Sequence, residues 1–142
     1  MRREPVEQGR RWLAQAEADL AAAYYNFDGE KFYVVCFLAQ QSAEKAIKAY
    51  LYATGEERVI GHAVTELLNR AGGTFESLGE DAPILDAYYL PSRYPDSLPG
   101  GIPAEVFGRS AAQAALDISK RVLDLAGKEL DNLDTRAGPD AP

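Results

Sequence analysis

Residues 32–51, FYVVCFLAQQSAEKAIKAYL, decide the fold. This segment contains no proline or glycine, and its apolar residues recur every three or four positions, which is the spacing of one face of an α-helix. We therefore predict a helix from about Lys31 to Thr54, ended by Gly55. The run from Phe32 to Leu38 is apolar on all sides, so we expect it to be covered by the core of the domain and also by an interface with a second molecule.

The same helical spacing continues on both sides of this segment. It predicts four further helices, at about residues 6–27, 62–70, 81–89 and 104–130. Four prolines and two glycines between Leu90 and Pro103 predict a loop over residues 90–103. The predicted fold is therefore all-α, an antiparallel up-and-down helical bundle of four to five helices, with one domain over residues 1–130 and a disordered C-terminal tail over residues 131–142.

Size and composition predict a single globular core. The chain has 142 residues, of which 46% are hydrophobic and 26% charged, as is usual for one domain. The longest apolar run, Phe32 to Ala39, is far shorter than the ~20 residues that cross a bilayer, and no apolar stretch follows Met1. We therefore expect no membrane association and a cytoplasmic protein. The single cysteine, Cys36, lies in that apolar run, and we interpret it as a small buried hydrophobe.

The formal charge of −7 limits the ligands that the chain can bind. An acidic protein repels nucleic acid as a whole, so any contact with RNA has to be local. The sequence contains neither a zinc-type pair of cysteines nor the glycine pattern of a phosphate loop or a dinucleotide site. We therefore predict no metal and no cofactor.

A strip of polar residues follows the predicted second helix. Gln41, Glu44, Lys45 and Lys48 are three or four positions apart, so their side chains can touch. One interpretation is an exposed helix face with a Glu44–Lys48 pair, worth only ~0.3 to 0.5 kcal/mol. The other is that Lys45 and Lys48, together with Arg93, form a local basic spot that binds an anion.

His62 is the only histidine and the default candidate for an acid–base step, because free histidine titrates near neutral pH. It is expected to begin the third helix. There it could instead cap backbone groups or bond to a tyrosine, and both interpretations stay open. A mechanism that needs two histidines from one chain is excluded.

Arg93 lies in the segment LPSRYPD (residues 90–96), where prolines on both sides restrict the backbone. Arginine is suited to bidentate contact with phosphate or carboxylate, and Tyr94 offers a face for stacking. This pattern predicts an anion-binding loop in which Asp96 orients Arg93. The alternative is that Arg93 pairs with Asp96 or Glu44 and only fixes the loop to the bundle.

Four stretches of the chain, in this order, resemble the prokaryotic HEPN domain proteins over roughly residues 7–130. They are Trp12–Leu20, Phe37–Ala49, Gly61-His62 followed by Leu67-Leu68, and Ser92–Asp96. The resemblance implies a bundle of four or five helices that forms homodimers. It also implies a toxin–antitoxin-type pairing with a minimal nucleotidyltransferase encoded beside it, and a possible ribonuclease activity.

The nuclease branch of that family carries an arginine, usually followed by a polar residue, and then a histidine after four to six intervening residues. Here Arg93 is followed by Tyr94-Pro95-Asp96-Ser97-Leu98-Pro99 without a histidine, and Arg58 precedes His62 by three intervening residues. The nuclease motif is therefore absent as written. What remains of the implied activities is a polar groove that binds a nucleotide or a similar anion.

Three functions follow from these residues. The first is a dimeric binding and assembly module beside a nucleotidyltransferase, which holds a nucleotide or another phosphate anion near the candidates Gln41, Glu44, Lys45, Lys48, Arg93, Tyr94 and Asp96. The second is a metal-independent ribonuclease toxin, in which Arg93 stabilises the scissile phosphate and His62 is the base. The third is a structural partner subunit without a ligand.

Overall fold

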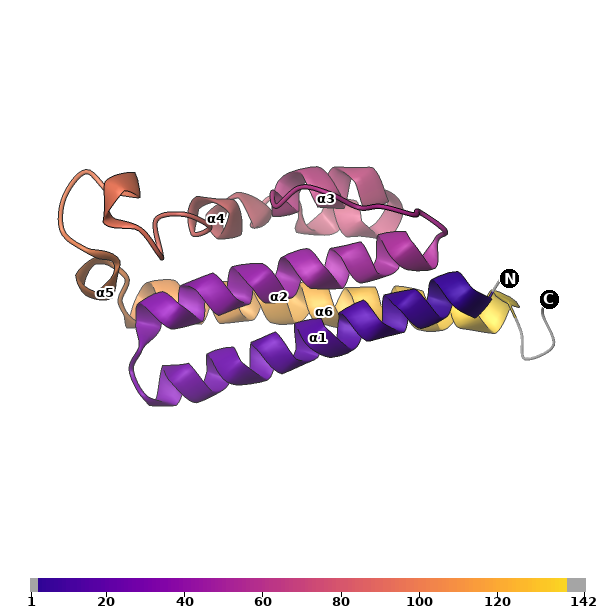
Figure 1. Ribbon diagram of the computed structural model, residues 1–142, viewed down its shortest axis with the longest axis horizontal. Helices are drawn as coiled ribbons and strands as arrows, with labels where there is room; N and C mark the ends of the chain where they lie inside the picture. The colour runs from indigo at the N-terminus through magenta and orange to yellow at the C-terminus, as the bar shows by residue number, and fades with distance from the viewer. Residues whose placement is uncertain (1–2, 138–142) are drawn as a thin grey trace.

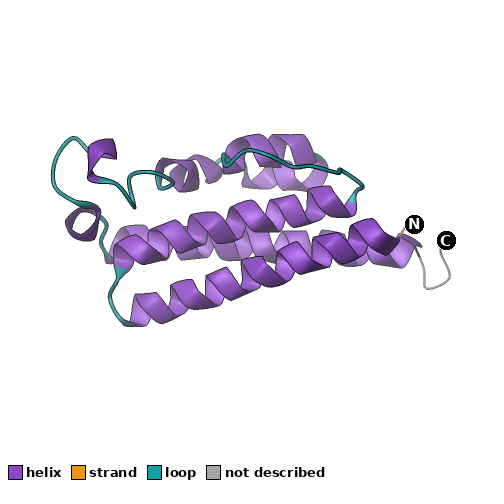
Figure 2. Cartoon of the chain, viewed as in Figure 1, coloured by secondary structure: helices purple, strands orange, loops and turns teal. Residues whose placement is uncertain are grey.

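The computed structural model describes residues 3–137, and every regular element among them is helical (Figure 2). Three long helices lie side by side, namely α1 (Arg3–Asp28), α2 (Phe32–Ala53) and α6 (Arg109–Ala137). Figure 1 shows α1 running opposite to both α2 and α6. We call these three helices the long-helix frame. None of the helices in residues 3–137 is long and apolar enough to span a bilayer.

The chain returns from the end of α2 to the start of α6 through a series of short elements, which we call the segmented leg (residues 59–106; Figure 1). Its elements are α3 (Val64–Ala71), the 3₁₀ helix η1 (Gly73–Leu78), α4 (Ala82–Ala87), the 3₁₀ helix η2 (Pro95–Ser97) and α5 (Pro103–Val106). The frame and this leg together form an up-and-down bundle. The all-α bundle predicted from the sequence is confirmed, although the 3₁₀ helices η1 and η2 were not predicted, and η2 lies within the predicted loop 90–103.

The last predicted helix begins later than its apolar spacing suggested. It was expected from residue 104, but α5 ends at Val106, Phe107 is extended with φ −89° and ψ 113°, and α6 begins at Arg109. The extended backbone lets the Phe107 ring turn into the core, where it is buried and contacts the Tyr88 ring edge-on at 5.3 Å. Burial of the Phe107 ring in the core thus stabilises the fold more than an unbroken helix through this position would.

The expected disordered tail is wrong for residues 131–137, because α6 continues to Ala137. Two carboxylates of this last part, from Asp131 and Asp134, lie 2.8 and 3.5 Å from the Arg10 guanidinium of α1. Leu133 packs partly buried against the core between them. The contacts that keep this end helical therefore come from α1, far away in sequence. Residues 138–142 of the predicted tail lie outside the described residues.

Small residues bring α1 and α2 close together. Four alanines along α2 are fully buried, namely Ala39, Ala43, Ala46 and Ala49. A Cβ atom at Gly9 of α1 would lie only 2.6 Å from the Ala49 carbonyl oxygen, so the helices approach there more closely than any other residue allows. The apolar face predicted for the second helix thus packs into the core of the domain.

Cys36 is fully buried in this core, as the sequence predicted. Burial raises the pKa of its thiol from 9.0 to about 12. The thiol therefore stays protonated at neutral pH, and Cys36 acts as a small hydrophobe.

The chain itself covers part of the apolar start of α2. The Phe32 ring meets the Phe27 ring of α1 edge-on at 5.4 Å, and the Arg109 guanidinium lies over both rings, at 4.9 and 5.4 Å. One turn later, Phe37 lies under the guanidinium of Arg93. Residues of α1, α6 and the segmented leg thus cover the apolar start of α2, which we had expected a second molecule to cover in part.

Candidate anion-binding site

A buried ion pair lies in the middle of α2. Lys48 Nζ is 3.0 Å from Glu44 Oε2, and the two side chains are only 7% and 5% exposed. The predicted pairing is present, but the predicted exposed helix face is wrong for these two residues. The chain that follows α2 covers them, since Gln40 Nε2 donates a hydrogen bond to the backbone oxygen of His62 at 3.0 Å. Because the pair is buried, removing one partner would leave an uncompensated charge in the core.

His62 is attached to this pair at the edge of the core. Its Nδ1 atom is 3.2 and 3.3 Å from the two carboxylate oxygens of Glu44. Its ring stacks on the Tyr89 ring, with centroids 4.8 Å apart and planes at 17°, and its side chain remains 57% exposed. His62 thus combines a buried carboxylate partner with an accessible ring.

His62 does not begin the third helix as expected, because α3 starts at Val64. The carboxylate of Asp86, from α4, accepts hydrogen bonds from the backbone nitrogens of Val64 and Thr65 and from the Thr65 hydroxyl. Asp86 therefore supplies the N-terminal cap that we had considered for His62. This contact ties the start of α3 to α4 and so brings His62 next to Tyr89.

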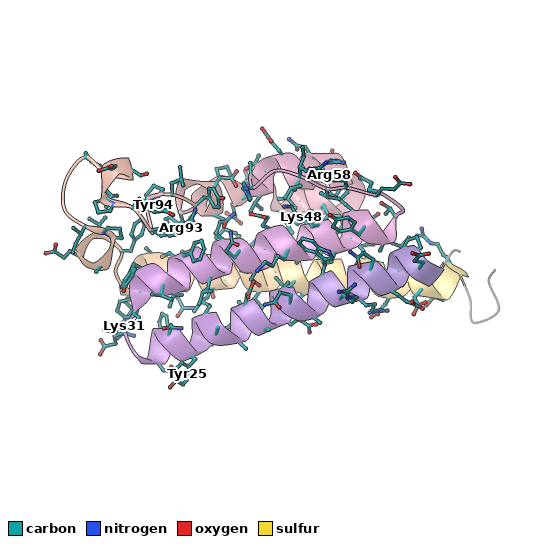
Figure 3. All side chains as sticks on the ribbon, viewed as in Figure 1. Tyr25, Lys31, Lys48, Arg58, Arg93 and Tyr94 are labelled. Atoms are coloured by element: carbon teal, nitrogen blue, oxygen red, sulfur yellow. The ribbon has the colours of Figure 1, made fainter. Side chains whose placement is uncertain are left out.

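Arg93 lies among three aromatic rings, one of which, Tyr94, is labelled beside it in Figure 3. Its Cζ atom is 4.6 Å from the centroids of Phe37 and Tyr89 and 5.0 Å from that of Tyr94. Its Nε atom donates a hydrogen bond to the Tyr89 backbone oxygen at 3.0 Å. Within residues 3–137, no carboxylate lies at salt-bridge distance from its guanidinium, so the expected pair with Asp96 or Glu44 does not form. The rings fix the direction of the cation and leave its charge without a counterion from this part of the chain.

The structure does not bring the predicted basic spot together. Lys45 points toward α1, where its Nζ atom lies 2.6 Å from the Asp19 carboxylate. Lys48 is neutralised by Glu44. Figure 3 shows Arg58 on the other side of Lys48 from Arg93, so Arg58 does not join Arg93 either. Arg93 is thus the cation that the site can offer to a ligand.

The remaining candidates lie at the periphery of the site. Gln41 donates through Nε2 to Gln40 Oε1 at 2.7 Å and so supports the amide that holds His62. Tyr94 is 51% exposed beside Arg93, and Asp96 is exposed within η2. Tyr94 therefore remains a candidate for stacking, whereas Asp96 does not orient Arg93.

Sequence reasoning missed four residues of the site. Gln40 lies four positions before Glu44 on the predicted second helix, so helical spacing could have found it. Tyr89 precedes Arg93 in a turn that contains Pro91, where helical spacing does not apply. Phe37 and Asp86 act across elements, on Arg93 and on the start of α3, and no local pattern indicates such contacts.

These observations define a small helical-bundle domain with a polar site between its second helix and the segmented leg. Residues 10–130 match the family model of the HEPN domain. The chain belongs to the HEPN family, as the resemblance of its motifs suggested.

Known relatives agree with this assignment. The chain is 31% identical over 126 residues to human sacsin; the match covers 84% of this chain but only 3% of the length of sacsin. Two solved structures are similar over almost their whole length, 98% of each chain. TT1696 from Thermus thermophilus has a TM-score of 0.81 and 35% identity over 86% of this chain. ST0689, an archaeal HEPN homologue, has a TM-score of 0.74 and 34% identity over 87%.

Proposed function

We propose that this HEPN protein is a binding and assembly module that holds a nucleotide or another phosphate anion at Arg93. The observation that carries the proposal is the guanidinium held among Phe37, Tyr89 and Tyr94 without a carboxylate partner in the described part of the chain. Arginine donors fixed in direction suit the oxygens of a phosphate, and the exposed Tyr94 ring offers a stacking face for a base.

The overall charge is compatible with this binding. The chain carries a net charge of −7, so a polyanion gains nothing from its general surface. At the site, however, the carboxylate of Glu44 is offset by Lys48 at 3.0 Å. A small phosphate ligand at Arg93 therefore meets a local positive potential rather than the average acidic one.

A calorimetric titration with adenosine 3′-monophosphate tests the proposal. Arg93→Met keeps an apolar side chain against the three rings but removes the charge, so we expect at least a tenfold weaker affinity, because a hydrogen bond to a charged group contributes about 1.5–3 kcal/mol. Arg11→Ala is the matched control, since it removes an exposed positive charge near the start of α1. The proposal fails if the wild-type protein does not bind, or if both variants lose the same affinity.

As part of the same proposal, the protein forms a homodimer and associates with a minimal nucleotidyltransferase in a toxin–antitoxin-type pair. Family membership supports this pairing, and so does a set of exposed large hydrophobic side chains in the last part of the segmented leg, residues 90–106, namely Leu90, Tyr94, Ile102 and Val106. Exposed apolar groups concentrated in one segment are typical of a contact surface for another protein.

Light scattering of the chain, alone and mixed with a minimal nucleotidyltransferase from the same genome, tests the assembly. We expect a dimer alone and a larger complex in the mixture. Val106→Asp should weaken the complex, whereas Ile60→Asp, on an exposed side chain before α3, should not. A monomer mass at micromolar concentration refutes the dimer, and an unchanged mass in the mixture refutes the partner.

A second candidate function is a metal-independent ribonuclease. One observation favours it: His62 and Arg93, the proposed base and the proposed phosphate ligand, both contact the Tyr89 ring. Incubation of the nuclease-free protein with total RNA, beside Arg93→Ala and His62→Ala, decides between the two functions. Cleavage that both substitutions abolish makes the protein a ribonuclease with a rearranged site. No cleavage by the wild-type protein leaves the binding module.

A further inference from the structure

The site contains one side chain that no ligand can reach and that still bears directly on recognition, the buried carboxylate of Glu44. Three donors surround it: Lys48 Nζ at 3.0 Å, Gln40 Nε2 at 3.2 Å, and His62 Nδ1 at 3.2 and 3.3 Å. A carboxylate beside an ammonium group only accepts hydrogen bonds, so the Nδ1 atom of His62 has to carry a hydrogen. In the neutral imidazole ring, the lone pair is then on Nε2.

Contacts fix the position of the His62 ring as well as its tautomer. The His62 backbone oxygen accepts a hydrogen bond from Gln40 at 3.0 Å, and the ring stacks on Tyr89. A ring flip would put the Cδ2–H group in place of Nδ1 and so break the contact with Glu44, and the other tautomer would point a lone pair at its carboxylate. No group of residues 3–137 makes a hydrogen bond to Nε2, and the side chain is 57% exposed. The free acceptor is therefore available to a ligand.

This acceptor and the cation of the site belong to two residues that both contact the Tyr89 ring. The His62 ring centroid and Arg93 Cζ are 4.8 and 4.6 Å from the centroid of the Tyr89 ring, so their separation cannot exceed the sum of these distances. Arg93 offers only donors and prefers an anion, whereas neutral His62 offers an acceptor and prefers a hydroxyl group. One ligand that satisfies both is a phosphate ester with a free hydroxyl group on the neighbouring carbon.

We propose that Glu44 is a positioning residue that presents Nε2 of His62 as a hydrogen-bond acceptor, so that the site selects phosphate esters with an adjacent hydroxyl group. Lys48 is part of this arrangement, because it neutralises Glu44 and so keeps the carboxylate in the core. This inference rests on the proposed binding of phosphate at Arg93. It adds a ligand preference that phosphate binding alone does not require.

Two nucleotides that differ in one hydroxyl group test the preference, adenosine 3′-monophosphate and its 2′-deoxy form. Titrated at pH 8.0, where free histidine is neutral, the wild-type protein should bind the ribose form about fivefold more tightly, the factor of one ordinary hydrogen bond. His62→Phe keeps a ring for stacking on Tyr89 but has no nitrogen. It should bind both nucleotides with the affinity that the wild-type protein has for the deoxy form.

The double variant Glu44→Leu/Lys48→Met tests the role of Glu44, because it replaces the ion pair with apolar side chains of similar size. It should lose the preference for the ribose form and keep the affinity for the deoxy form. The ¹⁵N spectrum of His62, the single histidine of the chain, should show a hydrogen on Nδ1 in the wild-type protein and a shift toward Nε2 in this variant. A purely structural role of Glu44 would not change the tautomer.

The possible outcomes separate this inference from the proposed function. Equal affinity of the wild-type protein for both nucleotides overturns the inference and leaves phosphate binding intact. A preference that persists in the double variant, or an unchanged tautomer, overturns the role of Glu44. If the wild-type protein binds neither nucleotide, the proposed function fails and the inference fails with it.

Discussion

The long-helix frame and the segmented leg are held in different ways. In the frame, α1, α2 and α6 pack through repeated small and aliphatic residues, with Ala16, Ala43, Ala46 and Ala126 fully buried. The leg also buries apolar side chains, such as Leu68, Phe75 and Leu85, in the same core. In addition, single polar contacts position its short helices, such as those of Asp86 with α3 and of His62 with Glu44. The frame therefore depends on many interchangeable contacts, whereas the geometry of the site depends on a few specific ones.

The frame and the leg contribute different parts of the candidate site. A ligand site needs a few groups at fixed positions, and rigid elements hold them better than mobile loops do. Here α2 carries Phe37, Gln40 and Glu44, which contact the candidate site residues of the leg. The frame thus provides the fixed half of the site, and the leg provides the accessible half, Arg93 and His62.

The largest expected effect comes from breaking the buried ion pair of α2, whose Glu44 also contacts His62 of the leg. Glu44→Leu alone leaves the Lys48 ammonium buried without a partner, so we expect a loss of ~3–5 kcal/mol in the free energy of unfolding. The double variant Glu44→Leu/Lys48→Met should recover most of that loss. Urea denaturation monitored by circular dichroism measures both. If the single and double variants are equally unstable, the loss comes from packing and not from the unpaired charge.

A smaller effect is expected from two glycines inside the frame. Gly9→Ala would place a Cβ atom 2.6 Å from the Ala49 carbonyl oxygen and 2.8 Å from Ala53 Cβ, which should cost ~1–3 kcal/mol. Gly127→Ala meets only Leu13 Cδ2, at 3.9 Å, and should stabilise α6 by ~0.5–1 kcal/mol. Thermal melting of the two variants should move in opposite directions. A rise in melting temperature in both variants would show that helix propensity, and not close packing, decides at Gly9.

In the leg, Asp86→Ala should cost ~1–2 kcal/mol, because the backbone nitrogens of Val64 and Thr65 lose their cap. The effect should be local. Hydrogen exchange of amides in α3 should become faster, while amides in the middle of α2 keep their protection. Uniformly faster exchange across the chain would mean that the leg and the frame unfold as one unit.

The frame could be predicted from the sequence because its residues carry a continuous helical period. The spacing indicated α1 and α2 to within a few residues, and it identified Cys36 as a core residue. Helical spacing predicted the wrong helix boundaries where contacts between residues far apart in the sequence determine the structure. Phe107 interrupts the last helix and contacts Tyr88, and α6 continues beyond residue 130, where Asp131 and Asp134 pair with Arg10 of α1 and Leu133 packs against the core.

The site was predicted only in part, for the same reason. Sequence reasoning selected His62, Glu44 and Arg93, but not the contacts that give them their roles. Helical spacing shows that Glu44 and Lys48 can pair, yet not that the chain after α2 covers them. Likewise, prolines around Arg93 indicate a restricted loop, whereas the ring of Phe37 that holds its cation belongs to another element.

The smallest effect at neutral pH is expected at Cys36, which belongs to the frame. Its pKa is raised by burial to about 12 in the folded protein, so the protonated thiol stabilises the fold fully below pH 9. That contribution is lost as the pH rises from about 9 toward 12, because the unfolded chain releases the proton first. Urea denaturation of the wild-type protein should show a fall in stability across this range, and Cys36→Ala should show a smaller fall. Burial also raises the pKa of Tyr88, so some loss of stability at alkaline pH should persist in Cys36→Ala. Equal losses in the two proteins would assign the alkaline transition to Tyr88 and other groups rather than to the buried thiol.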